Sequence, residues 1–210
     1  MRLDGLPTPC LILDRTKLER NIGRMAAALA RHGTPLRPHM KTAKSIEVAR
    51  LVLADQPGGI TVSTLAEAEY FAAHGIQDIL YAVGITPQKL DQVAKLNAAG
   101  AAVAVITDDL TMAEVIAAHP TPPRTLIEID TGEGRGGLTP DDPALLAIAA
   151  KLGGALGGVM THAGHSYAAR SLADIALVAE AERAGAVRAA ERLRGVGHDP
   201  AVVSVGSSPT

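Results

Sequence analysis

The residue of this sequence with the clearest chemical potential is a lysine that ends a short predicted strand. Arg37, His39 and Lys41 alternate with other residues along the segment 36–41. Because successive side chains of a strand point to opposite faces, these three basic side chains are expected to share one face. An amine at a strand end can form a Schiff base with an aldehyde; a solvated lysine after an edge strand is the alternative.

A glycine and two serines follow the last predicted strand. Gly206, Ser207 and Ser208 offer backbone N–H groups and two hydroxyls, the composition of a nest that binds phosphate. An ordinary Gly-Ser turn is the alternative. Combined with the amine of Lys41, the pattern favours a phosphorylated aldehyde cofactor, which means pyridoxal phosphate.

A glycine-rich loop follows the predicted strand 125–130. Glu128 and Asp130 alternate with apolar residues there, so both carboxylates are expected to point inward, where an unpaired charge is costly. We expect them to have cationic partners, with Arg37 among the candidates. Arg135 lies among the loop glycines and can bind a carboxylate or a cofactor oxygen, or be an ordinary surface arginine.

Two histidines, a serine and a tyrosine occur together in the segment 162–167, a density that a purely structural loop seldom needs. His162 can stack on a cofactor ring. Tyr167 can act as an acid or hold the substrate, with a packed tyrosine as the alternative. No second ligand cluster accompanies His162 and His165, so we do not expect this pair to bind a metal.

The composition excludes several classes of partner. Twenty basic and 22 acidic residues leave no basic surface for nucleic acid and no polybasic membrane patch, so a small molecule is the expected partner. No apolar run is long enough for a signal peptide or a membrane span, and Cys10 is the only cysteine. We therefore expect a cytoplasmic protein in which Cys10 is a small core residue.

The candidate site residues follow different predicted strands, so they need a fold that brings the ends of these strands together. Short aliphatic runs alternate with Ala-rich stretches of helical period, such as 16–31, 44–53 and 64–74. This alternation predicts a parallel (β/α)₈ barrel, whose chemistry lies at the carboxyl ends of its strands; an open doubly wound sheet is the alternative. The eight predicted strands are 10–13, 36–40, 60–63, 79–82, 102–106, 125–130, 157–162 and 202–205.

The chain resembles a known family in the order and spacing of separated motifs. The family is that of the fold-type III pyridoxal-phosphate enzymes related to alanine racemase, in the branch of D-serine dehydratase and D-threonine aldolase. Segments 59–69 and 78–83 look particularly like the D-threo-3-hydroxyaspartate dehydratase side of that branch. The motifs are 8–14, 37–42, 130–135, 161–167 and 206–210.

The resemblance implies roles for individual residues. Lys41 is expected to form the Schiff base, with Tyr167 near the substrate and His162 facing the cofactor ring. The cofactor-binding residues are then Lys41, His39, Arg135, His162, Tyr167, Gly206, Ser207 and Ser208. The implied activity is that of a lyase acting on a D-3-hydroxy amino acid, with dehydration preferred to retro-aldol cleavage. Racemase activity and a non-catalytic pyridoxal-phosphate carrier are the alternatives.

The sequence departs from the family in two respects. Ala43 stands where many relatives have histidine. Relatives also continue into a β-rich second domain that supplies a divalent-metal site, for zinc or manganese, and the full-length form is expected to be a homodimer. We therefore expect 1–210 to be the cofactor-binding barrel domain, without its last helix and without the second domain, and not a competent lyase by itself.

Overall fold

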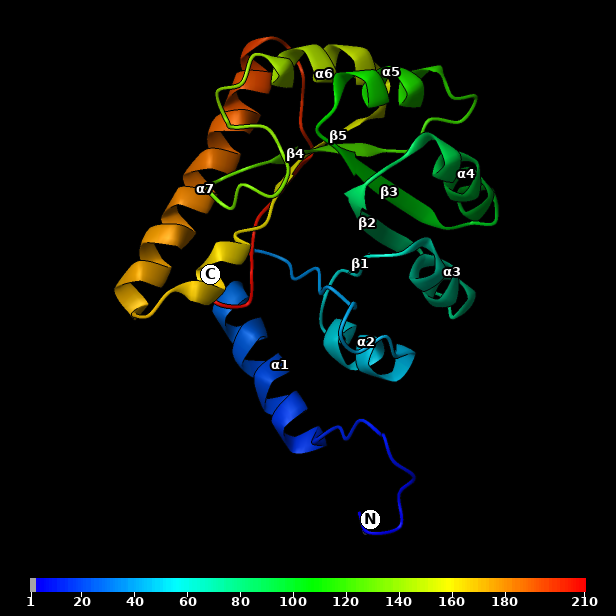
Figure 1. The fold of residues 1–210 in the computed structure, drawn as a ribbon, viewed down its shortest axis with the longest axis vertical. Helices are drawn as coiled ribbons and strands as arrows, with labels where there is room; N and C mark the ends of the chain where they lie inside the picture. The colour runs from blue at the N-terminus through cyan, green and yellow to red at the C-terminus, as the bar shows by residue number, and fades with distance from the viewer. Residues whose placement is uncertain (1–2) are drawn as a thin grey trace.

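The computed structural model describes residues 3–210, and one parallel β-sheet forms its centre. The six strands lie in chain order, each hydrogen-bonded to the next, with helices around the outside (Figure 1). Because the strand order never reverses, the sheet is part of a barrel and not a doubly wound sheet. The strands are β1 (Ile60–Val62), β2 (Asp78–Gly84), β3 (Ala102–Thr107), β4 (Thr125–Ile129), β5 (Leu156–Thr161) and β6 (Val202–Ser204).

The described residues form seven α-helices, of which none is long and apolar enough to cross a membrane. Side chains at the predicted helix starts cap them: Thr64 Oγ1 accepts the N–H of Glu67 at 3.1 Å, and Glu67 Oε2 in turn accepts the N–H of Ser63 at 2.8 Å. The helices are α1 (Arg15–Ala30), α2 (Ile46–Leu53), α3 (Leu65–Ala73), α4 (Leu90–Ala98), α5 (Leu110–Ala118), α6 (Ala144–Leu152) and α7 (Leu172–Gly195).

Two apolar clusters hold the sheet. The larger one lies between the sheet and its helices and includes the fully buried Phe71, Ile116 and Ile148. The smaller one joins Leu80, Ile106, Leu126 and Met160 on the other side of the strands. The core is almost entirely aliphatic, as the scarcity of aromatic residues predicts, and burial of this apolar surface supplies the main stabilisation of the fold.

The prediction of eight strands is wrong for the first two. The segment 36–40 contributes only an isolated bridge between His39 and Thr61. Pro35 and Pro38 lack backbone N–H groups, so a hydrogen-bonded ladder cannot extend along this segment.

The segment 10–13 lies outside the sheet, where Leu11 is 100% exposed. Cys10, predicted to lie in the core, is an exposed free cysteine. Helix α1 has no buried residue and projects away from the sheet in Figure 1. The physical reason is that no described element lies over this segment, so its apolar side chains have nothing to pack against.

Candidate active site

The carboxyl ends of the strands bring the predicted site residues to one edge of the sheet. Lys41 follows the bridge at His39, and His162 directly follows β5. The segments after β3, β4 and β6 bring Asp108, Asp130 and Gly206 to the same edge. This arrangement follows from parallel strands, whose carboxyl ends all lie on one side of the sheet. The structure thus brings Lys41, His162 and Gly206 to the same edge of the sheet, and their roles there stay predictions.

Lys41 is an exposed side chain whose amine has no hydrogen bond or ion pair with residues 3–210. Its neighbour Lys44 differs, because Lys44 Nζ lies 3.1 Å from Glu67 Oε1. Two lysines three positions apart therefore have different chemical availability. The free amine at this edge of the sheet is that of Lys41.

His39 is held as a neutral imidazole beside Lys41. Its Nδ1 accepts the backbone N–H of Lys41 at 3.3 Å, so Nε2 carries the proton and donates to Ser63 Oγ at 3.3 Å. Burial of the ring, reinforced by the nearby charge of Lys41, lowers the pKa of His39 to about 4.

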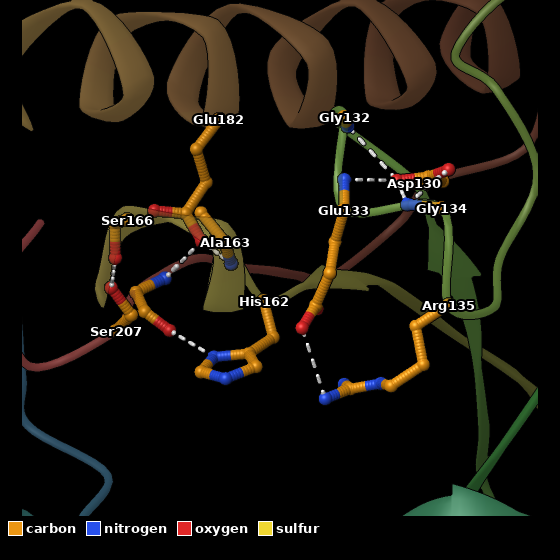
Figure 2. A network of polar contacts seen from close by, with 11 residues as sticks. Asp130, Gly132, Glu133, Gly134, Arg135, His162, Ala163, Ser166, Glu182 and Ser207 are labelled. Carbon is orange, nitrogen blue, oxygen red and sulfur yellow. Dashed lines mark hydrogen bonds and ion pairs between the residues drawn. The ribbon is translucent and has the colours of Figure 1, made fainter. Parts of the chain in front are cut away.

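The imidazole of His162 has the opposite tautomer. His162 Nδ1 donates to the carbonyl oxygen of Gly206 at 3.0 Å, so Nε2 of the neutral ring is an acceptor. Nε2 of His162 has no hydrogen-bond partner among residues 3–210. In Figure 2 the ring of His162 and the guanidinium of Arg135 extend to the same side of the loops that carry them.

The glycine-rich loop after β4 is organised by Asp130. Asp130 Oδ1 accepts the backbone N–H groups of Gly132 and Glu133, each at 2.9 Å, and Gly134 adds a further contact (Figure 2). Burial alone would raise the pKa of Asp130, but these N–H groups stabilise the carboxylate and leave its pKa below the usual value. The loop thereby presents Arg135, which pairs with Glu133 at 3.3 Å and remains mostly exposed.

The prediction that Glu128 and Asp130 have cationic partners, with Arg37 among the candidates, is wrong for residues 3–210. Arg37 lies at the opposite end of the sheet, where its two terminal nitrogens contact the Asp78 carboxylate at 3.0 and 2.6 Å. Asp130 is satisfied by backbone amides, and Glu128 has no ion pair with any residue of 3–210. Burial, reinforced by the nearby Asp108, raises the pKa of Glu128. The wrong pairing came from assigning Arg37 to a face without knowing which end of the strand it occupies.

The predicted phosphate nest has internal hydrogen bonds at two of its three amides. Gly206 N–H donates to Glu182 Oε1 at 3.0 Å, and Ser207 N–H donates to Thr210 Oγ1 at 3.0 Å. Ser208 N–H makes only a long contact of 3.4 Å with the hydroxyl of Tyr167. Gly206 adopts φ of 133°, and no other atom lies within 4 Å of a Cβ built on it. Space is therefore open beside Gly206, with the amide of Ser208 as the most available donor.

Glu182 of α7 is a site residue that was not identified from the sequence. Its side chain is 2% exposed, and it accepts hydrogen bonds from Ala163, which Figure 2 shows, and from Gly206 and Thr210. A signal was present: Glu182 shares a helical stripe with the buried Ala186 and Ala189, where a carboxylate is unexpected. The described residues contain no group of three or more His, Cys, Asp or Glu side chains placed to hold a metal ion.

Comparisons with known proteins agree with this geometry. The D-threo-3-hydroxyaspartate dehydratase of Delftia sp. (strain HT23) is 46% identical over 98% of this chain and 56% of that protein. Its solved structure superposes with a TM-score of 0.95, at 45% identity over the same shares of the two chains. The 3-hydroxy-D-aspartate aldolase of Paracoccus denitrificans (strain Pd 1222) is 40% identical over 64% of this chain and 36% of that protein.

The chain spans about half the length of the curated relatives that it matches from end to end. The family model described as the alanine racemase N-terminal domain matches residues 13–210, nearly the whole sequence. This protein belongs to the family of the alanine racemase N-terminal domain.

Proposed function

We propose that this protein binds pyridoxal phosphate and is a lyase that dehydrates a D-3-hydroxy amino acid. The observation that carries the proposal is the unpaired amine of Lys41 at the edge of the sheet where the strands end. A free amine beside a neutral imidazole suits attachment of an aldehyde, because neither group is neutralised by a carboxylate. The similarity to a dehydratase over 98% of the chain supports the reaction class.

The residues around Lys41 fit this cofactor. The open space beside Gly206 and the loosely bonded amide of Ser208 suit a phosphate group. The free Nε2 of His162 and the exposed guanidinium of Arg135 are available to a ring and to an anionic oxygen. We infer that these residues, with His39 and Tyr167, form the cofactor site and that residues 1–210 are the cofactor-binding domain.

In the proposed reaction, bound pyridoxal phosphate supplies an electron sink for the charge that develops at the substrate α-carbon. Lys41 Nζ would hold the cofactor and, once displaced by the substrate amine, would accept the proton from the substrate α-carbon. His162 would face the ring, and Arg135 would bind an anionic oxygen. The hydroxyl of Tyr167 contacts the Ser208 amide at 3.4 Å, which supports a role for Tyr167 beside the proposed phosphate site.

Loss of the β-hydroxyl requires an acid or a Lewis acid, and the resemblance implies a divalent metal such as zinc or manganese in this role. One solved variant of the Delftia dehydratase is described as its metal-free form. Residues 3–210 of this chain contain no side-chain cluster that fits a metal. The proposed steps at Lys41, His162 and Arg135 therefore involve no metal ligand from these residues.

Product analysis of the complete protein tests the proposal. The protein loaded with pyridoxal phosphate is incubated with D-threo-3-hydroxyaspartate or D-serine, with and without added zinc or manganese. Dehydration releases ammonia and a 2-oxo acid, whereas retro-aldol cleavage releases glycine and an aldehyde. The first outcome supports the proposal, and the second selects the aldolase function suggested by the Paracoccus relative. A protein that holds the cofactor without turnover of either substrate is a non-catalytic carrier, and the proposed lyase is then wrong.

A further inference from the structure

We propose that Glu182 is a positioning residue that sets the tautomer and the place of His162. The loop after β5 and the loop after β6 both contact its carboxylate. Oε1 of Glu182 accepts the N–H of Ala163 at 2.9 Å and the N–H of Gly206 at 3.0 Å. Ala163 directly follows His162, and the carbonyl of Gly206 is the acceptor for His162 Nδ1. One carboxylate oxygen thus holds both ends of the contact that orients the imidazole (Figure 2).

The second oxygen of Glu182 fixes the direction of a chain of hydroxyl groups. Because a carboxylate only accepts, the Thr210 hydroxyl donates to Oε2 at 2.9 Å. Each hydroxyl has one proton, so Ser207 Oγ must donate to Thr210 Oγ1 at 2.8 Å, and Ser166 Oγ must donate to Ser207 Oγ at 2.7 Å. The protons of all three hydroxyls therefore point towards Glu182.

This polarity has a consequence for the proposed cofactor site. The Ser207 hydroxyl has no proton left to donate to a phosphate, which leaves the Ser208 amide and the Ser208 hydroxyl as the more available donors. His162, held with its proton on Nδ1, presents the lone pair of Nε2 towards the space beside Arg135. The link to catalysis rests on the proposed function, whereas the link between Glu182 and His162 rests only on contacts within this chain.

Histidine NMR of the cofactor-free protein tests the link directly. Nitrogen-15 shifts distinguish the Nδ1–H from the Nε2–H tautomer, and His162→Gln identifies the His162 signals. Glu182→Gln keeps an acceptor oxygen for the two amides and should retain the Nδ1–H signature; Glu182→Ala should lose it. Glu180→Gln is the matched control, because Glu180 is two positions away on α7 and contacts only the exposed Arg183. Retention of the Nδ1–H tautomer in a folded Glu182→Ala protein overturns the proposal, as does its loss in Glu182→Gln.

Hydrogen exchange in the unsubstituted protein covers the case in which Glu182→Ala does not fold. The amides of Ala163 and Gly206 should be protected, while the amide of Ser208 in the same loop should exchange about tenfold faster or more, given one weak contact against a charge-assisted bond. Equal exchange at all three amides overturns the proposal. Both readouts are taken without cofactor. A failure to bind pyridoxal phosphate would therefore refute the proposed function and leave this inference standing.

Discussion

The two ends of the sheet hold their charged residues in different ways. At the amino end, Arg37 contacts both oxygens of Asp78 and also the carbonyl of Ile60, so the charges are matched. At the carboxyl end, Lys41 and Glu128 have no ion pair with residues 3–210. Unpaired charged groups are costly in a partly buried setting, and they are found where a ligand supplies the missing partner. The comparison separates an end at which the charges are paired from an end at which two charged groups have no ion pair with residues 3–210.

The largest expected effect at the carboxyl end comes from Lys41→Ala. Reduction with borohydride in the presence of pyridoxal phosphate should fix the cofactor to Lys41, and the substitution should abolish the label completely because no other free amine lies at the site. Lys44→Ala is the matched control and should keep the label, since the Lys44 amine is paired with Glu67. Peptide mapping by mass spectrometry measures both. A label found on Lys44 in the parent protein would refute the role of Lys41.

The next effect is expected at the loop after β6. Gly206→Val should weaken binding of pyridoxal phosphate by tenfold or more, because φ of 133° is strained for a branched residue and its side chain fills the open space. Such backbone strain costs on the order of 1–3 kcal/mol. Ser208→Ala is the comparison variant: it keeps the Ser208 backbone amide and removes at most one hydroxyl contact, so it should change the dissociation constant less than Gly206→Val does. Absorbance titration measures the dissociation constant of pyridoxal phosphate for each variant. Equal dissociation constants for the two variants would show that the phosphate binds elsewhere.

At the amino end, Arg37→Ala should lower the free energy of unfolding by about 1 kcal/mol, near the upper range for a partly exposed pair with good geometry. Cofactor labelling at Lys41 should not change. Arg183→Ala, which breaks a fully exposed pair on α7, should lower the free energy of unfolding less than Arg37→Ala does. Urea denaturation measures all three proteins. Loss of cofactor labelling at Lys41 in the Arg37→Ala protein would contradict the distinction drawn between the two ends of the sheet.

Further effects are expected from pH. The pKa of His39 is lowered to about 4, so the unfolded chain binds a proton there at higher pH than the folded protein does. Stability from this group is fully present above about pH 6.5, the usual histidine pKa, and is lost as the pH falls through 4. His39→Gln should flatten this part of the stability curve in urea denaturation at several pH values. An unchanged slope would show that His39 titrates normally.

Glu128 should act in the opposite direction. Its raised pKa means that its ionisation costs stability as the pH rises from the ordinary glutamate range through the folded pKa. Glu128→Gln should therefore be more stable than the parent at neutral pH and equal to it in acid. Removal of a charge thus stabilises the carboxyl end, whereas Arg37→Ala destabilises the amino end. A Glu128→Gln protein that is less stable at neutral pH would indicate a hidden partner for this carboxylate.

Much of the scaffold was predictable because it depends on local chemistry. The last six predicted strands correspond to β1–β6, and Thr64 caps α3 as expected. The first two predicted strands are absent because alternation of apolar side chains shows only that a segment could join a sheet. A strand must also offer backbone donors and acceptors to a neighbouring strand. In the second predicted strand, Pro35 and Pro38 have no backbone N–H group to offer.

The partners of the charged residues were less predictable. Arg37 and Glu128 are both on alternating segments, yet they lie at opposite ends of the sheet, and Arg37 contacts Asp78 instead. Glu182 is 20 positions beyond His162 in the sequence, and only the docking of α7 brings its carboxylate to the loops after β5 and β6. Long-range pairing of this kind depends on the relative placement of whole elements.

The sequence by itself determined the α/β class, the position of His162 at a strand end, and the family resemblance, because these follow from periodicity and from short motifs. Tertiary structure alone decided which lysine is free, which tautomers His39 and His162 adopt, and which charges are paired. The physical reason is that hydrogen bonds and ion pairs act over a few ångströms. Their partners are therefore chosen only when distant segments have been packed together.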